Sequence, residues 1–462
     1  MTLLPAMTTA LLATTAACQP ARQPAERQLT FSPENKILTN INVWSRDSAW
    51  IAFDTRPGEG DPFTGGTIAL VNASSGEIRV LYSLRDGAHA GVVTCSPVAD
   101  EAVFILAPEN PTPDWTYAAT RRRGVLVDFN APQKLRPFDA MNYAAPLTPG
   151  ALRGGSHVHV FNAAGNRISH TYEDEILAAL DKLPSPPPHH PNQRNVAVAM
   201  PRPVQTARTH PRNHDGEWFS VLATRTTASP RPGSDDLSRA CEEGWIGDNG
   251  YLKPDGSRQR HALAFQGTVT AADGRPHAEV FVVDLPEKNL ATPGDAPLEG
   301  TLTTLPAPPA GTVQRRLTFT ENRPHRGIQG PRHWLRSSPD GSRIAFLMRD
   351  PAGLPQLWTI SPNGGTPRQI TNAPGGIASA FSWHPDGRRL AAVADGSVCL
   401  FDMDTGALTR LTPKRPRADA PSPLACVISP DGAQVAYTRP VNGVSQIFTV
   451  PVPPAPSGKR LP

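Results

Sequence analysis

Two histidines in one short apolar segment are the residues of this sequence best suited to chemistry. The segment, residues 154–161, reads GGSHVHVF, which is typical of a β-strand. Alternate residues of a regular strand project from one face, so we expect His157 and His159 to point the same way. Two imidazoles on one face are half of a transition-metal site. The pair therefore predicts a divalent metal; the alternative is two partly buried rings bonded to backbone groups.

Two further histidines precede turns of the same kind. His210 lies ahead of the turn at residues 214–216, and His333 lies ahead of the turn at residues 338–341. In a repeated β-fold the strands that lead into equivalent turns run side by side, so these rings are expected to converge with the pair. The predicted metal ligands are therefore His157, His159, His210 and His333.

Arginines are frequent on the same approaches. A guanidinium fork suits the recognition of a carboxylate or a phosphate. The predicted ligand-binding residues are Arg153, Arg194, Arg225 and Arg332. The alternative is that the arginines form ion pairs with the acids Glu173, Asp174, Glu242 and Glu243.

Motifs for the common enzyme chemistries are missing from the sequence. It contains no glycine-rich phosphate loop, serine elbow or Cys/His dyad, so no catalytic residue is assigned. The 45 basic and 41 acidic side chains nearly balance and are dispersed, which argues against nucleic-acid binding. The 5 cysteines show neither metal-ligand spacing nor a disulfide framework.

A threefold repeat near the C-terminus indicates the elements that position these residues. Ser-Pro-Asp-Gly or His-Pro-Asp-Gly begins at Ser338, His384 and Ser429, at a spacing of about 45 residues. Pro, Asp and Gly favour a tight turn, and apolar residues with strand propensity follow each copy. Several strands per repeat at this spacing predict an all-β fold, a β-propeller.

The number of blades and the closure of the ring follow from similar patterns. Hairpins near Trp44, Cys95 and Phe161, a fourth at residues 214–222 and the three late repeats predict seven blades, with six and eight as alternatives. Residues 26–31 match the strand ends of later repeats. We therefore expect an N-terminal strand to complete the C-terminal blade and close the ring, which removes two exposed sheet edges.

Two insertions interrupt the single predicted propeller, which spans residues 26–462. The first, at residues 173–208, begins with an amphipathic helix capped by Thr171. The second, at residues 226–260, contains a helix capped by Ser234.

Residues 1–25 have the composition of an export leader. They are small and apolar but too short to span a bilayer comfortably, and residues 15–18 loosely resemble a lipoprotein box ending in Cys18. No basic residue precedes Arg22, so the alternative is a disordered or mis-started terminus. The leader predicts a periplasmic or cell-envelope protein without a transmembrane span, with Cys18 as the site of a lipid anchor.

The repeats over residues 27–450 resemble those of TolB-type propellers, whose blades carry this Ser-Pro-Asp-Gly hairpin and a Leu-Thr strand end. Three longer segments are similar to the YidR-like family of TolB-related propellers, namely residues 154–175, 210–245 and 332–341. The resemblance implies a propeller fold, and it brings no established activity.

A more distant resemblance concerns chemistry. Oligogalacturonate lyase is a propeller whose axial site holds divalent manganese through histidines, and its His-x-His pair before a hairpin is similar to His157-Val158-His159. The resemblance implies that manganese would bind a uronate carboxylate and acidify the adjacent C–H for β-elimination. No residue of this sequence can be assigned as the base.

Two functions of different classes are therefore predicted. In the first, the protein is an exported monomer that binds a cell-envelope partner or a ligand at the mouth of its central channel. In the second, it is a metal-dependent lyase of acidic saccharides, with manganese as its cofactor. Convergence of the four histidines would favour the lyase, and scattered histidines would favour binding. We favour binding, because no base can be assigned and the TolB-like signature is spread along the chain.

Overall fold

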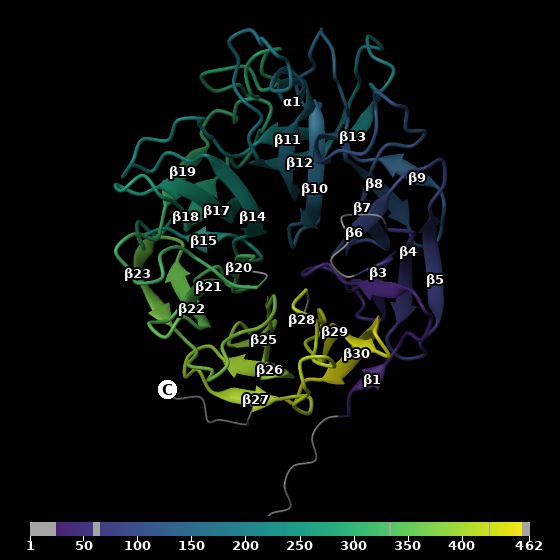
Figure 1. Cartoon of the computed structure of the whole chain (residues 1–462), viewed down its shortest axis with the longest axis vertical. Coiled ribbons are helices and arrows are strands. Elements are labelled where there is room, and N and C mark those ends of the chain that lie inside the picture. The colour runs from purple at the N-terminus through teal and green to yellow at the C-terminus, as the bar shows by residue number, and fades with distance from the viewer. Residues whose placement is uncertain (1–24, 59–64, 332–333, 425, 455–462) are drawn as a thin grey trace, which may run out of the picture.

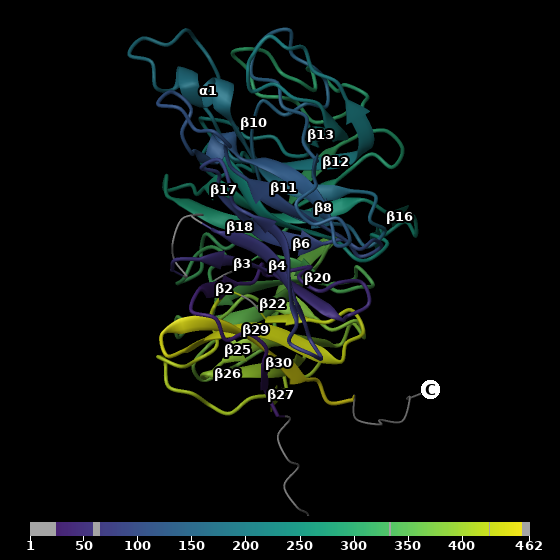
Figure 2. The same cartoon turned by 90° about the vertical axis from the view of Figure 1, so that its right-hand side faces the viewer.

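The computed structural model describes residues 25–58, 65–331, 334–424 and 426–454. Seven four-stranded antiparallel sheets surround a central axis as the blades of a propeller (Figure 1). In every blade one strand lies nearest the axis and the others follow outward, and Figure 2 shows the same ring from its side. The all-β, seven-bladed prediction is confirmed.

The strands of each blade are given in order from the axis outward. Blades 1 and 2 contain β2 (Asn35–Ile37), β3 (Trp50–Arg56), β4 (Thr67–Asn72) and β5 (Ile78–Ser83), then β6 (Ala90–Cys95), β7 (Glu101–Leu106), β8 (Arg123–Asp128) and β9 (Leu135–Pro137). Blades 3 and 4 contain β10 (Gly154–Phe161), β11 (Ile168–Asp174), β12 (Asn195–Val204) and β13 (Gly216–Leu222), then β14 (Arg239–Trp245), β17 (Ala262–Thr270), β18 (Pro276–Asp284) and β19 (Val313–Arg316).

The remaining blades follow the same order. Blades 5 and 6 contain β20 (Arg336–Ser337), β21 (Ile344–Arg349), β22 (Pro355–Ser361) and β23 (Gly364–Gln369), then β24 (Ser382–Trp383), β25 (Arg389–Ala394), β26 (Ser397–Asp402) and β27 (Leu408–Arg410). Blade 7 contains β28 (Cys426–Ile428), β29 (Gln434–Val441), β30 (Val444–Pro451) and β1 (Arg27–Gln28). The short elements outside the blades are η1 (Ala119–Arg121), α1 (Glu175–Leu180), β15 (Tyr251–Leu252) and β16 (Arg258–Gln259).

Strand β1 closes the ring by pairing with β30. Gln28 lies opposite Phe448, and the amide of Leu29 donates to the carbonyl of Ile447 at 2.8 Å. The Thr30 hydroxyl continues the seam, because it donates to Gln446 Oε1 at 2.7 Å. The predicted N-terminal strand is therefore the outermost strand of the C-terminal blade.

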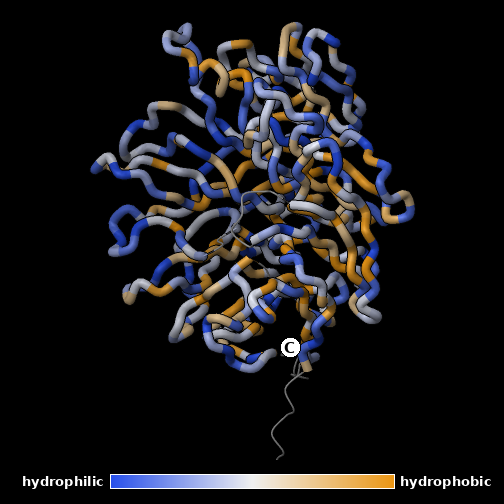
Figure 3. Tube along the Cα trace, turned by 45° about the vertical axis from the view of Figure 1, so that its right-hand side comes forward, coloured by the Kyte–Doolittle hydropathy of each residue, from blue (hydrophilic) through white to orange (hydrophobic). Residues whose placement is uncertain are grey.

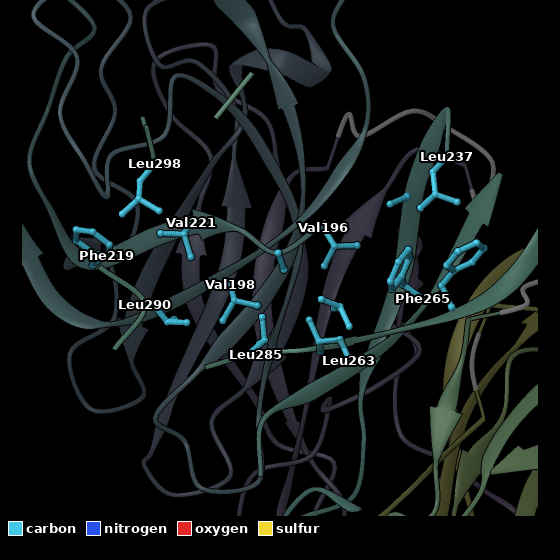
Figure 4. Close-up of a cluster of buried hydrophobic side chains, with 14 of the residues drawn as sticks. Val196, Val198, Phe219, Val221, Leu237, Leu263, Phe265, Leu285, Leu290 and Leu298 are labelled. Carbon is cyan, nitrogen blue, oxygen red and sulfur yellow. The ribbon is translucent and has the colours of Figure 1, made fainter. Parts of the chain in front are cut away.

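Hydrophobic side chains fill the spaces between neighbouring blades. Figure 4 shows the cluster between blades 3 and 4, where Val196 and Val198 of β12 join Leu263 and Phe265 of β17, all fully buried. Removing such a side chain from water contributes about 1.5–3 kcal/mol. Figure 3 shows the corresponding pattern, with hydrophobic stretches along the strands and hydrophilic residues in the outer loops.

The seven blades are present, but the predicted fourth hairpin was wrong. Residues 214–222 contain β13, which is the outermost strand of blade 3. The inner hairpin of blade 4 joins β14 to β17, and the small hairpin β15–β16 is inserted between them with its turn at Pro254–Gly256. Turn chemistry marks where strands reverse, but it does not say which of the four strands are joined.

The two predicted helices had different outcomes. The first helix, predicted at residues 173–183, is present as the shorter α1. The predicted cap was wrong, because Thr171 lies in β11. Asp174 caps the helix instead, since its side chain accepts from the Leu177 amide at 2.9 Å. The second, predicted at residues 235–243, was wrong, because strand β14 begins at Arg239 and pairs with β17.

The leader prediction lies outside the described residues. None of the described helices is long and apolar enough to cross a membrane.

The closing seam gives a first prediction. Thr30→Val should lower the free energy of unfolding by about 1–3 kcal/mol, because Gln446 and the Ile447 amide both lose a buried hydroxyl partner. Urea unfolding followed by circular dichroism measures the change. Thr409→Val, at an exposed strand position, is the control. Equal stabilities of the two variants would contradict the role given to the seam.

Candidate functional site

A cup opens at the end of the axis where the inner hairpins turn. Its volume is about 410 Å3, and residues of all seven blades line it. We call it the channel cup and define it by the lining residues Ile41, Trp44, Val160, Trp245, Arg336 and Trp383. Figure 1 shows the inner strands β6, β10, β14, β20 and β28 gathered around this axis.

Three tryptophans form much of the wall of the channel cup, and each is tied to a neighbouring blade. Trp44 Nε1 donates to the carbonyl of Val427 at 2.9 Å, and Trp245 Nε1 donates to that of Val160 at 2.9 Å. Trp383 Nε1 donates to the carbonyl of Arg336 at 3.0 Å. These bonds satisfy the polar edge of each indole.

An apolar cluster of inner-strand and neighbouring residues borders the cup. It comprises Val158, Val160 and Trp334, with Ile41, Val92 and Trp245 packed against them. These residues come from the innermost segments of five different blades, so their cluster lies across the channel. Ile41, Val160 and Trp245 of this cluster also line the channel cup, so apolar side chains border it.

Arg336 is the buried charge of the cup. Its side chain crosses from blade 5 toward blade 1, where Nη2 donates to Asn40 Oδ1 at 2.5 Å. Its Nη1 donates to the carbonyls of Leu335 at 2.9 Å and Glu243 at 3.5 Å. A Cβ at residue 244 would lie 2.5 Å from the Leu335 carbonyl oxygen and 3.3 Å from Nη1. Gly244 therefore leaves the space that the guanidinium uses.

The guanidinium stays charged although it is only 5 % exposed. Burial lowers the pKa of Arg336 to about 10, which is still well above neutrality. Its hydrogen bonds go to carbonyl and amide oxygens, and no carboxylate among the described residues forms an ion pair with it. The charges of Glu243 and Glu242 act in the other direction and raise the pKa of Arg336. A buried cation that no carboxylate contacts directly favours the approach of an anion.

Glu243, whose carbonyl accepts from Arg336, is a fully buried acid. Burial raises the pKa of its carboxyl to about 7, although a hydrogen bond from Thr171 and the charge of Arg336 act in the other direction. The Thr171 hydroxyl lies 3.3 Å from Glu243 Oε2. Near neutral pH this acid is therefore partly protonated and only a partial counter-charge for Arg336.

The two histidines of the sequence pair make separate contacts, because β10 is irregular. A bulge lies between His157 and Val160, and Val158 has a φ of 57°. Alternation is lost there, so the expected common face is not formed. His157 Nδ1 lies 3.1 Å from Arg122 Nη1, whereas the fully buried His159 places Nε2 3.1 Å from Ser156 Oγ.

The other predicted ligands do not complete a metal site. The ring of His210 lies beside Trp115 and Tyr143, at centroid distances of 5.5 and 5.6 Å, and His333 lies outside the described residues. Within the described ranges no group of three or more His, Cys, Asp or Glu side chains is arranged to hold a metal ion. The guanidinium beside His157 also opposes a cation there. The described residues therefore do not fit the manganese of the sequence hypothesis.

Three of the four predicted ligand-binding arginines are held by acids. Arg153 is buried, and its Nε donates to Asp174 Oδ2 at 2.6 Å. Arg194 pairs with Glu173 at 2.8 Å and Arg225 pairs with Asp295 at 2.6 Å. Asp174 and Glu173 are two of the acids that the ion-pair alternative named, whereas Asp295 was not among them. Arg332 lies outside the described residues.

Sequence reasoning missed the residues that line the channel cup. A usable signal exists, because a tryptophan stands three residues before an aspartate at three of the inner hairpins, beginning at Trp44, Trp245 and Trp383. For Arg336 no local signal exists. Its importance comes from burial between three blades, which no short motif encodes.

Comparison with known proteins places the chain in a family. It is 47 % identical over 417 residues to the uncharacterised protein YidR of Escherichia coli strain K12, which covers 89 % of this chain and 94 % of that protein. The chain belongs to the YidR family. A family model described as a protein of unknown function, DUF3748, matches residues 89–214, which span blade 2 and much of blade 3. The predicted YidR-like membership is confirmed.

Solved propellers share the fold of this YidR family member at low sequence identity. Oligogalacturonate lyase in complex with manganese superposes with a TM-score of 0.53 at 13 % identity, covering 94 % of this chain and 95 % of the lyase. A putative TolB from Agrobacterium tumefaciens has a TM-score of 0.39 at 14 % identity, covering 84 % of this chain and 98 % of that one. At 13 % identity the likeness to the lyase concerns the fold alone.

Glu243 generates a second prediction. Between its ordinary pKa of 4.5 and the raised value of about 7, the folded state binds more protons than the unfolded state. The free energy of unfolding should therefore fall as pH rises through this window, by up to about 3 kcal/mol. Glu243→Gln should remove that part of the pH dependence in urea unfolding, whereas the exposed control Glu77→Gln should keep it. Identical slopes in the two variants would refute the assignment.

Proposed function

We propose that this protein is a binding propeller that holds an acidic ligand in the channel cup. The observation that carries the proposal is the buried, charged Arg336, which lines the cup and forms no hydrogen bond or ion pair with a carboxylate among the described residues. An anionic group on a ligand would supply the missing counter-charge in a site of low dielectric constant, where charge pairing is strong.

The donors of Arg336 support a carboxylate as that group. A guanidinium has five N–H donors, and the described bonds use those of Nη1 and one of Nη2. Nε has no acceptor among the described residues, so it can donate to a carboxylate oxygen of a ligand. The indoles of Trp44, Trp245 and Trp383 suit the apolar faces of a sugar ring or of a peptide segment.

The occupant that we propose is an acidic segment of a cell-envelope partner, and acidic saccharides are compared with it in the experiment below. The envelope location rests on the leader composition of residues 1–25. The proposed location, the lipid anchor at Cys18 and the monomeric state are independent of the cup and can be tested separately.

The lyase hypothesis has less support. It needs a ligand set for a divalent metal and a base, and the described histidines make separate contacts with Arg122 and Ser156. The likeness to oligogalacturonate lyase, at 13 % identity, is one of fold. Binding is therefore the better-supported function.

Ligand titration tests the proposal directly. Tryptophan fluorescence of the full chain is recorded with an acidic peptide, with oligogalacturonate and with a neutral oligosaccharide. We expect a response to the acidic peptide that weakens at least about tenfold in Arg336→Met, since a tenfold change corresponds to the loss of about 1.4 kcal/mol. Arg260→Met, an exposed arginine outside the cup, should bind like the wild type.

The design separates binding from loss of fold. Arg336→Lys keeps a positive charge but lacks the fork, so it should fold and still bind more weakly. Equal responses to acidic and neutral ligands, or full binding by Arg336→Met, would contradict the proposal. Formation of unsaturated products from oligogalacturonate, followed by absorbance, would instead support the lyase.

Metal analysis tests the alternative independently. Mass spectrometry of the purified protein and of the double variant His157→Ala/His159→Ala should find no bound metal that depends on the pair, because the two rings make separate contacts. One manganese, iron or zinc per chain, lost in the double variant, would overturn this expectation and favour the lyase.

A further inference from the structure

In five blades an aspartate stands at the same place after the innermost segment. In blades 1, 5, 6 and 7 a serine or a histidine lies two positions before it, whereas blade 4 has Ile246 there. The five aspartates are Asp47, Asp248, Asp340, Asp386 and Asp431. Among the described residues, Asp248 is the one of these five that lines the channel cup.

In the other four blades the turn itself uses the carboxylate. Ser45, Ser338 and Ser429 each donate a hydroxyl hydrogen bond of 2.5 Å to the aspartate two residues further on. Asp386 instead lies 3.1 Å from His384 Nδ1. These carboxylates therefore stabilise their own turns.

The sequence of blade 4 removes Asp248 from this role. Ile246 is buried and has no side-chain donor, so the hydrogen bond of the other turns is absent. The Asp248 carboxylate forms no hydrogen bond or ion pair with the described residues, and burial raises its pKa. In Asp47, by contrast, the Ser45 hydroxyl is the main cause of a lowered pKa. An exposed aspartate is ionised near neutral pH, so Asp248 gives the cup an anion that the fold does not use.

The backbone of Asp248 is nevertheless held firmly by blade 5. Its amide donates to the carbonyl of Pro339 at 2.8 Å. The amide of Gly247 donates to Ser337 Oγ at 3.1 Å, and Ser337 is the neighbour of Arg336 in the chain. The same contact between blades 4 and 5 therefore positions Asp248 and Arg336.

The cup thus presents two charges that no opposite charge contacts directly. The charged side chains of its lining are those of Arg46, Asp248 and Arg336. Arg46 is neutralised, because its Nε lies 2.8 Å from Asp100 Oδ1. The buried cation Arg336 and the exposed anion Asp248 remain, and both line one cup of about 410 Å3. A single short ligand segment can therefore contact both.

We propose that the occupant of the channel cup is a dipolar peptide segment, in which an acidic residue contacts Arg336 and a neighbouring lysine or arginine contacts Asp248. The inference rests on the function proposed above, and it adds Asp248 as a specificity-determining residue. Complementary charges fix the register of a ligand and exclude wrong partners. A chain of uronates carries carboxylates only, so Asp248 would repel it, and a peptide is the better fit.

Fluorescence titration of the full chain tests this with short capped peptides that carry one glutamate and one lysine, in either order. Matched peptides carry methionine in place of the lysine. We expect one order to bind the wild type about three- to fivefold more tightly than its methionine counterpart, which is the effect of a partly exposed charge pair. Asp248→Asn should abolish this preference, and Asp419→Asn, at an exposed position outside the cup, should keep it.

A charge reversal provides a gain of function. Asp248→Lys should prefer a peptide with two glutamates to the peptide with glutamate and lysine. Because the Asp248 carboxylate makes no contact with the described residues, both variants should fold like the wild type, which circular dichroism checks. An unchanged preference in the folded variants would contradict the role of Asp248.

The results also separate this inference from the function on which it rests. Arg336→Met should weaken the lysine and methionine peptides alike. If it does so while the wild type binds both peptides equally, the dipolar ligand is refuted and an acidic ligand still stands. Failure of the wild type to bind either peptide would refute both proposals. Tighter binding of oligogalacturonate than of the lysine peptide would identify an acidic saccharide and overturn the peptide.

Discussion

The pairing of β1 with β30 is the constraint on which the rest of the molecule depends. A propeller whose ends are not joined would expose two sheet edges and open the apolar spaces between its first and last blades. The chain avoids this by giving its last blade a strand from its N-terminus, with Thr30 and Gln446 bonded across the seam. Once the ring is closed, all seven inner strands must converge on one axis.

The convergence creates both the channel cup and its charge. Inner strands from different blades approach closely enough that Arg336 reaches Asn40 in blade 1 and the carbonyl of Glu243 in blade 4. Gly244 is needed at this point, because a Cβ would meet the Leu335 carbonyl. The buried guanidinium is costly to desolvate unless its donors are occupied, and this is why its surroundings consist of carbonyl and amide oxygens.

Irregular backbone shapes the apolar cluster beside the cup. Three inner strands, β6, β10 and β14, carry a bulge at equivalent places, and Val92, Val158 and Glu242 there have φ values of 57°, 57° and 58°. For a β-branched valine this conformation is strained, and it persists only where the surrounding structure imposes it. In return Val92 and Val158 join the apolar cluster across the channel. The same bulge in β10 separates the contacts of His157 and His159.

The sequence by itself determined the fold class, the closing strand and the family, because these depend on turn chemistry and strand patterns that recur along the chain. It predicted seven blades with one hairpin misplaced. The repeats beginning at Ser338, His384 and Ser429 specify local structure directly. Only the tertiary structure decided the site. The bulge at Val158 cannot be read from an alternating pattern, and Pro254–Gly256 gives no sign that its hairpin is an insertion. Arg336 differs from other arginines only in what surrounds it, and burial between blades is a property of the closed ring and of no single segment.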